Sequence, residues 1–417
     1  DTLAAAVQGY QQVLALDPEF APAYSGLAET YLLMSQYTNM LENESIRRAK
    51  PNVERALQLA PNTAESLTTA AFFAAFEKRY DQALVLANRA IAANPNYADA
   101  FLRKARVLWQ LGRKDEFLMA IQKAWALDPL SSVILSNLSD AQLAVGDRDA
   151  AKRTLRDNVR WNPESPFGLQ GLARLSYEDG DIAAAHSLHK DALALNPEGT
   201  NSQSGLASIY MDVGMYGEVS RVSKQPADIA LALIFAGQKE QGLKLARDNL
   251  NTASMAFVLF ASGDVKGAYP YAQKFVTESN LLQAPTNRNM VGAFAAIAFI
   301  YQENGDGDAN IFSGKVQTYL GADVRPADKI IANDLQTGMI LQLIKGEEGA
   351  AYAWIDRYLD LGFAGEAFFT APPFDALRGT PEFAKRETRM KQNAAKHRAE
   401  IEAQLENPKP NWVKVLP

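Results

Sequence analysis

Apolar residues recur through the first half of the chain at the three- and four-residue spacing of amphipathic helices. Many of these stretches end at a proline, as in ERALQLAP and NRAIAANP. Proline lacks the N–H group that would continue a helix, and its ring clashes with the preceding turn. A second amphipathic stretch follows each proline, so the pattern predicts a unit of helix, turn, helix and proline. Five of these prolines stand 34 residues apart: Pro61, Pro95, Pro129, Pro163 and Pro197.

Glycines repeat with the same period, in the predicted turn between the two helices of each unit. The backbone there needs a left-handed or tight conformation, which glycine adopts at little cost. Apolar residues also recur at fixed places in each unit. The unit after Pro95 has Phe101, Ala105, Leu108, Phe117, Ile121 and Ala124, and the repeated glycines are Gly112, Gly146, Gly180 and Gly214.

This combination resembles the tetratricopeptide repeat (TPR) family. The resemblance implies an all-α fold, a right-handed α-α superhelix in which helix pairs stack into a solenoid. We predict that residues 1–224 form a TPR array, with a partial first unit, an extended first full repeat and then 34-residue repeats. The 34-residue register is lost after that point, although amphipathic stretches continue. Residues 225–417 are therefore predicted to form degenerate TPR-like repeats that end in a polar capping helix.

Two irregularities mark the start of the array. The interval from Pro18 to Pro61 is 43 residues, nine more than the period. The extra residues form either a loop on the binding face or a longer turn followed by a longer helix. Residues 2–17 resemble the second helix of a repeat without its first helix. An apolar side around Tyr10 would then be bare, so we expect preceding residues or a homodimer to cover it.

Composition argues against several classes of function. The chain has 42 basic and 48 acidic residues and a net charge of −6, which disfavours direct binding to nucleic acid because that requires a basic face. It contains no cysteine, so disulfides, thiol catalysis and zinc–thiolate sites are excluded. No run of 18 apolar residues occurs, and no membrane span is predicted. None of these features locates the protein in a compartment.

The search for catalytic, cofactor and metal motifs returns none, which predicts a non-enzyme without cofactor or metal. His186 and His189 have a spacing that could place two imidazoles on one metal, but His189 falls on a helix-packing position. A packing role is therefore predicted. Residues 304–315 imitate a calcium loop, but Ile311 and Gln317 replace its glycine and closing glutamate. An inter-helix turn is predicted there.

The remaining candidate chemistry is a surface. In the TPR family the first helix of each unit lines a concave groove, and this register implies a groove that binds a protein or peptide. Arg106 and Arg174 could each bind a carboxylate, with Trp109 and Tyr177 as flat apolar contacts. The alternative is a solvated arginine and a tryptophan that packs between repeats. The lysine and asparagine clamp of chaperone-binding members is not reproduced. The predicted groove residues are Phe72, Leu102, Arg106, Trp109, Asp140, Gln170, Arg174 and Tyr177.

A narrower resemblance covers both ends of the chain. The opening VQGYQQVLALDPEFAPAYSGLAETYLL and the ending PPFDALRGTPEF resemble the TPR half of bacterial signalling proteins. In these proteins, CadC/ToxR-like winged-helix regulators or cyclase–TPR proteins, an effector domain precedes the repeats. The resemblance implies the sensor or interaction region of a signalling protein or transcriptional regulator. It favours a periplasmic location, and a cytoplasmic one stays open. A periplasmic or outer-membrane assembly scaffold and an all-helical enzyme are the other hypotheses.

Overall fold

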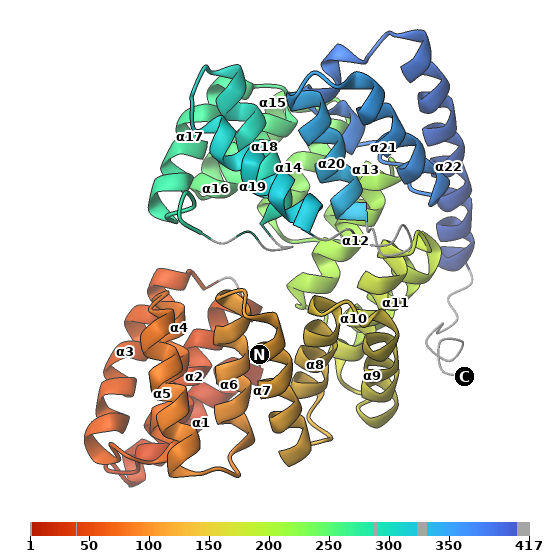
Figure 1. The fold of residues 1–417 in the computed structure, drawn as a ribbon. Helices are drawn as coiled ribbons and strands as arrows, with labels where there is room; N and C mark the ends of the chain where they lie inside the picture. The colour runs from red at the N-terminus through yellow and green to blue at the C-terminus, as the bar shows by residue number, and fades with distance from the viewer. Residues whose placement is uncertain (1, 39, 285, 287–289, 323–331, 407–417) are drawn as a thin grey trace. The chain divides into compact units, whose positions relative to one another are not determined.

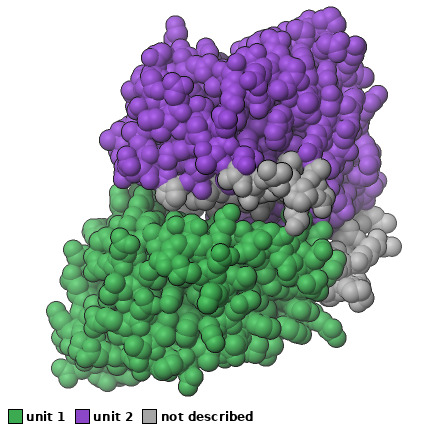
Figure 2. All heavy atoms as spheres, viewed as in Figure 1, with its two compact units in different colours: residues 1–171, 195–199 green, residues 172–194, 200–417 purple. Residues whose placement is uncertain are grey.

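The computed structural model describes residues 2–38, 40–284, 286, 290–322 and 332–406. Within these residues the chain forms 22 α-helices and two short 3-10 helices, and no strand (Figure 1). The predicted all-α fold of stacked helix pairs is therefore confirmed. The chain divides into two compact units (Figure 2). Unit 1 comprises Asp1–Gly171 and Leu195–Gly199, and unit 2 comprises Leu172–Ala194 and Thr200–Pro417.

Unit 1 begins with a single helix, α1 (Thr2–Leu16), and a stack of helix pairs follows it. Each pair consists of two helices joined by a short turn, as the proline and glycine spacing predicts. The pairs are α2 (Ala21–Tyr37) with α3 (Glu42–Leu59), α4 (Ala64–Phe76) with α5 (Tyr80–Ala93), α6 (Ala98–Gln110) with α7 (Lys114–Leu127) and α8 (Ser132–Ala144) with α9 (Arg148–Trp161). The next helix, α10 (Pro166–Glu178), begins in unit 1 and ends in unit 2.

The long interval between Pro18 and Pro61 lengthens a helix pair. Helices α2 and α3 have 17 and 18 residues, whereas the helices of the next two pairs have 13 or 14. Of the two alternatives left open by the sequence, the longer helix is therefore the one that the structure shows. Residue 39, within the short connection between α2 and α3, lies outside the described residues.

The turn between the helices of a pair uses glycine for its conformation. Gly112 and Gly146 have φ angles of 70° and 86°, in the left-handed region that side chains with a Cβ rarely adopt. The sequence-based explanation of the repeated glycines is confirmed at these positions. The same turns bring the second helix of each pair back against the first.

Ala105 lies where α6 and α7 approach each other. It is fully buried in one apolar cluster with Leu108, Phe117 and Ile121. Ala105→Leu is expected to overpack this cluster and to lower the free energy of unfolding by about 1–3 kcal/mol. Urea denaturation measures the loss, with Gln110→Leu at an exposed position of the same helix as the control. Equal stability of the two variants would contradict the register assigned to α6.

The first helices of successive pairs line the inner side of each unit. In unit 1, α2 packs on α4 and α4 on α6, and the second helices of successive pairs approach one another less closely. A stack with its first helices drawn together in this way curves around them. The rings of Tyr37 in α2 and Phe167 in α10 meet edge to face, with centroids 6.4 Å apart.

Unit 2 continues the helix pairs beyond the point at which the sequence period is lost. Its helices are the end of α10, α11 (Ile182–Leu195), α12 (Thr200–Asp212), α13 (Tyr216–Val222), α14 (Pro226–Phe235), α15 (Lys239–Asn249), α16 (Thr252–Ala261), α17 (Val265–Glu278), α18 (Val291–Glu303), α19 (Ala309–Ala322), α20 (Ala332–Ile344) and α21 (Glu348–Asp360). Two short 3-10 helices, η2 (Phe368–Thr370) and η3 (Pro372–Ala376), and the long helix α22 (Pro381–Glu406) follow.

Helix α22 contacts both α21, in the last helix pair of unit 2, and α11 and the end of α12, at the start of the unit. Near the start of α22, Arg389 forms an ion pair with Asp356 of α21, at 3.1 Å. Further along, Arg398 donates a hydrogen bond to the carbonyl of Val213, which follows α12, at 2.7 Å. Near the end, Gln404 donates to the carbonyl of Ala183 in α11, at 3.0 Å. The sequence predicts a terminal cap, and the structure shows that α22 also closes unit 2 on itself.

A buried carboxylate lies at this closure. Asp212 ends α12 and accepts hydrogen bonds from the backbone N–H of Gly365, at 2.8 Å, and from the hydroxyl of Tyr358, at 3.1 Å. Burial raises the pKa of Asp212 from 3.8 to about 6, against the opposing effect of these hydrogen bonds and of His397. The folded protein therefore holds a proton at Asp212 more tightly than the unfolded chain does.

This difference predicts a pH dependence of stability. Because the folded-state pKa of Asp212 is raised, the free energy of unfolding should increase as the pH falls from about 7 toward 4, by at most about 3 kcal/mol from this group. Buried His186 and His189 have lowered pKa values and oppose the trend. Chemical denaturation of wild type and Asp212→Asn between pH 7.5 and 5 isolates Asp212. The stability difference between them should change with pH, and a constant difference would contradict the assignment.

Candidate functional site

The inner side of unit 1 carries side chains at equivalent repeat positions of successive first helices. Phe72 of α4, Arg106 of α6 and Asp140 of α8 stand 34 residues apart. Glu29 of α2 lies as far after Pro18 as Phe72 lies after Pro61. The repeat therefore brings an acid, an aromatic ring, a base and a second acid to one face of unit 1.

Glu29 is the centre of a hydrogen-bond network that crosses three first helices. Its two carboxylate oxygens accept from Arg103 Nη2 of α6 and from Thr69 Oγ1 of α4, each at 2.8 Å. The Arg103 guanidinium also lies over the Phe72 ring, with Cζ 3.8 Å from the centroid. Arg103 is only 8% exposed, so its charge is compensated by Glu29 and by the face of the ring.

Arg106 lies beside this network without such compensation. Its Cζ is 5.6 Å from the centroid of the Phe72 ring, which Arg103 covers more closely. Burial first, and then the charge of Arg103, lower the pKa of Arg106. Among the residues that the structure describes, no carboxylate or carbonyl accepts a hydrogen bond from its guanidinium. Burial of a cation without a hydrogen-bond acceptor costs free energy, and an anionic group of a partner would offset this cost.

The structure places the other predicted groove residues in different surroundings. Phe72 and Leu102 are each 4% exposed and belong to apolar clusters, so a partner could reach only their edges. Trp109 is half-buried against the ring of Phe117, with centroids 5.4 Å apart. Asp140 and Gln170 are half-buried on α8 and α10.

The last two predicted groove residues, Arg174 and Tyr177, belong to unit 2. Arg174 is exposed, and the Tyr177 ring lies 5.5 Å from that of Phe363. The use of the eight residues as one binding surface therefore stays a prediction.

Sequence reasoning did not single out Arg103. Its partner Glu29 is 74 residues away in the chain, and the pair forms only because helices of different repeats pack side by side. One signal was present in the sequence. Arg103 occupies the repeat position of Thr69, 34 residues earlier, and both side chains reach Glu29. A polar residue at that position of two successive repeats indicates a shared partner on the preceding repeat.

The two neighbouring histidines have packing and hydrogen-bonding roles. The ring nitrogens of His186 lie 2.8 Å from Gln404 Oε1 and 2.9 Å from the hydroxyl of Tyr210. The His189 ring lies against Gly205, where any added Cβ would meet it at 2.4 Å. Burial lowers the pKa of His189 to about 4. The packing role predicted for His189 agrees with these contacts.

Residues 304–308 of the calcium-like stretch form the turn between α18 and α19, as predicted, and residues 309–315 are the start of α19. Asp306 accepts hydrogen bonds from the backbone N–H of Asp308, at 3.0 Å, and from the hydroxyl of Tyr269, at 2.7 Å. Across the described ranges, no group of three or more His, Asp or Glu side chains could hold a metal ion. No described helix is both long enough and apolar enough to cross a lipid bilayer.

Comparison with known proteins supports a TPR protein. The sequence profile of the tetratricopeptide repeat family matches residues 74–118, which cover the end of α4 through the start of α7. Together with the 34-residue period and the helix pairs, this match identifies the repeats as TPR-like. No curated protein matches the chain.

Solved structures resemble parts of the chain at low identity. A thermophilic TPR protein of Thermus thermophilus is 18% identical, with 44% of this chain and 99% of that chain covered and a TM-score of 0.39. YrrB, described as a TPR protein with an unusual peptide-binding site, is 17% identical, with coverages of 48% and 97% and a TM-score of 0.31. PilF of Pseudomonas aeruginosa is 17% identical, with coverages of 67% and 96% and a TM-score of 0.34.

Proposed function

We propose that this TPR protein is a non-catalytic scaffold that binds a protein or peptide on the inner side of unit 1. The observation that carries the proposal is Arg106, a half-buried cation that has no acceptor among the described residues. An acidic side chain or a terminal carboxylate of a partner would compensate it through two parallel hydrogen bonds. Trp109, half-buried beside it on α6, offers a flat apolar contact.

We further propose that the chain is the sensor or interaction region of a bacterial signalling protein or transcriptional regulator. The support for this finer proposal is the resemblance of both ends of the sequence to the repeat half of such proteins. The partner would then be a protein that reports a signal to the repeats. Arg174 is exposed on α10 in unit 2, and we propose it as a carboxylate contact of that unit, separate from the surface of unit 1.

Charge reversal tests the binding surface. The double variant Arg106→Glu and Arg174→Glu should keep the far-UV circular dichroism of the wild type and lose capture of the partner in a pull-down. The matched control is Arg160→Glu, an exposed arginine in the last turn of α9, a second helix. The single variants show which arginine matters. Capture that survives the double reversal would refute this surface and would favour residues 33–48 as the binding segment.

A homodimer through the first helix stays a prediction. Within the chain α1 packs on α2, and the Tyr10 ring lies against Gly26, where an added Cβ would meet it at 2.3 Å. Part of the side expected to be bare is therefore covered inside the chain. Val13 and Leu16 of α1 remain exposed. A dimer would use these two residues.

A further inference from the structure

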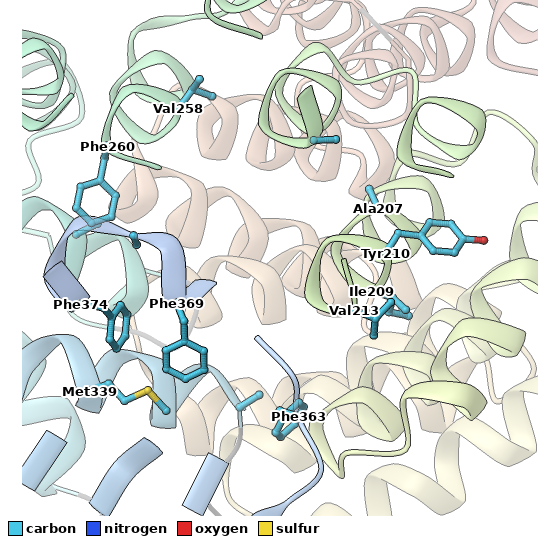
Figure 3. Packing of buried hydrophobic residues seen from close by; sticks show 14 of the residues in the cluster. Ala207, Ile209, Tyr210, Val213, Val258, Phe260, Met339, Phe363, Phe369 and Phe374 are labelled. Carbon is cyan, nitrogen blue, oxygen red and sulfur yellow. The ribbon is translucent and has the colours of Figure 1, made fainter. Parts of the chain in front are cut away.

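The segment between α21 and α22 lies among the first helices of unit 2. Residues 362–378, here called the inner segment, follow α21 and contain η2 and η3. Phe363, Phe369, Phe374 and Leu377 are at most 5% exposed. They belong to one apolar cluster with residues of α12, α14, α16, α18 and α20, part of which Figure 3 shows. The inner side that is a candidate binding face in unit 1 is therefore occupied by the chain itself in unit 2.

The inner segment is organised by its own contacts. The Arg378 guanidinium donates hydrogen bonds to the carbonyls of Phe369, Thr370 and Ala371, at 3.1–3.2 Å. The rings of Phe368 and Phe374 pack edge to face on Phe369 and on each other, with centroids 4.9–5.4 Å apart. The segment thus presents a compact aromatic surface whose parts also contact one another.

Polar contacts from α12 and α22 fix the two sides of the loop that starts the inner segment. The backbone N–H of Glu366 donates to the Asp212 carbonyl at 3.0 Å. On the other side, Asn393 and His397 of α22 donate to the carbonyls of Phe363 and Gly362, at 2.9 and 2.8 Å. Arg398 adds an ion pair with Glu366 at 3.2 Å.

Most of α22 faces water, and its buried residues are one thin stripe: Phe383, Met390, Ala394, His397 and Ile401. An element with so few buried apolar groups and so many polar contacts opens at a lower free energy than a packed helix stack. Opening of α22 would remove one side of the hydrogen bonds that hold the inner segment. The helix stack of unit 2 would keep its contacts between first helices.

We infer that the side of unit 2 formed by the first helices of its pairs binds aromatic, proline-containing segments. Residues 362–378 of the same chain fill this side, and the contacts of α22 hold them in place. Release of α22 would open this face to a segment of the same chemistry from another chain. The inference goes beyond the function proposed for unit 1, because it concerns a different face and a different ligand chemistry.

The test uses the full chain and a fluorescent synthetic peptide of residues 361–380. Asn393→Ala with Arg398→Ala removes α22 contacts to the loop and leaves the inner segment unchanged. Fluorescence anisotropy should show binding to this variant at least about tenfold tighter than to the wild type, because the free face is populated more often. A peptide with Phe369→Ser and Phe374→Ser should not bind. Hydrogen exchange should be faster in residues 362–378 and unchanged in α14 and α16.

Two results would overturn the inference. The peptide could bind wild type and variant equally, or fail to bind the variant. Alternatively, the amides of residues 362–378 could exchange together with those of α14 and α16, which would make the segment an ordinary part of the core. If the double variant does not fold, Arg389→Ala removes only ion pairs to Asp356 and Asp360 and should show a smaller shift in the same direction. Charge reversal at Arg106 should not affect peptide binding, which separates this test from that of unit 1.

Discussion

Phe374→Ala is expected to lower the free energy of unfolding of unit 2 by about 3–5 kcal/mol. Phe374 has no exposed surface, and its ring packs edge to face on Phe368 and Phe369, with centroids 5.1 and 4.9 Å away. Truncation removes the transfer free energy of the ring and leaves a cavity between the inner segment and α20. Urea denaturation monitored by hydrogen exchange in unit 2 measures the loss.

Phe368→Ala is the matched control, because Phe368 lies in the same segment and is only half-buried. It should cost clearly less than Phe374→Ala. Equal and small losses for both variants would mean that the inner segment contributes little to the core of unit 2. The aromatic cluster would then not be the contact that closes this unit.

Glu29→Ala is expected to lower the free energy of unfolding of unit 1 by about 3–5 kcal/mol. Glu29 provides the carboxylate that compensates Arg103, and the Arg103 side chain is 9% exposed. Its loss leaves the buried guanidinium with the Phe72 ring and the charge of Asp99, and it also removes the acceptor of the Thr69 hydroxyl. Because the Arg103 side chain is buried, this effect should exceed that of an ion pair between two exposed side chains.

A double variant distinguishes the cost of the uncompensated Arg103 charge from the cost of lost packing at position 29. Glu29→Leu together with Arg103→Met replaces both charges by apolar groups of similar volume, and this should recover most of the loss. A double variant as unstable as Glu29→Ala would mean that packing at position 29, and not the uncompensated charge, determines the cost. Thermal and urea unfolding of the three proteins at one pH and salt concentration make this comparison.

The sequence predicted the elements of the fold because its period records local structure. Proline spacing placed the helix ends, and Gly112 and Gly146 have the left-handed backbone that their position predicted. Amphipathic stretches after residue 225 correctly predicted further helices. The inner segment could not be predicted, because its aromatic residues follow no helical period and its partners lie on helices far apart in the chain, such as α12 and α20. Closure by α22 also depends on contacts that are far apart in the chain, such as Gln404 with Ala183.

The candidate site stays a prediction, and the structure shows only where its residues lie. The repeat register identified Arg106 and Trp109 on the inner side, because that register follows from the period alone. It did not show that Phe72 and Leu102 are almost fully buried, since burial depends on the packing between neighbouring repeats. The repeat register also did not predict that Glu29 compensates the charge of Arg103. Because Arg103 already has this acceptor, we propose Arg106, and not Arg103, as the contact for a partner.

Site-specific photo-crosslinking tests the binding role of unit 1 most directly. A photoreactive phenylalanine analogue at Trp109, on the inner side of α6, should form adducts with the partner in cells that produce the protein. The same analogue at Val85, exposed on the second helix α5, should form few or none. Adducts from Trp109 that disappear with Arg106→Glu are the result that the account predicts. Adducts from Val85 in equal or greater yield, unaffected by that charge reversal, would contradict it.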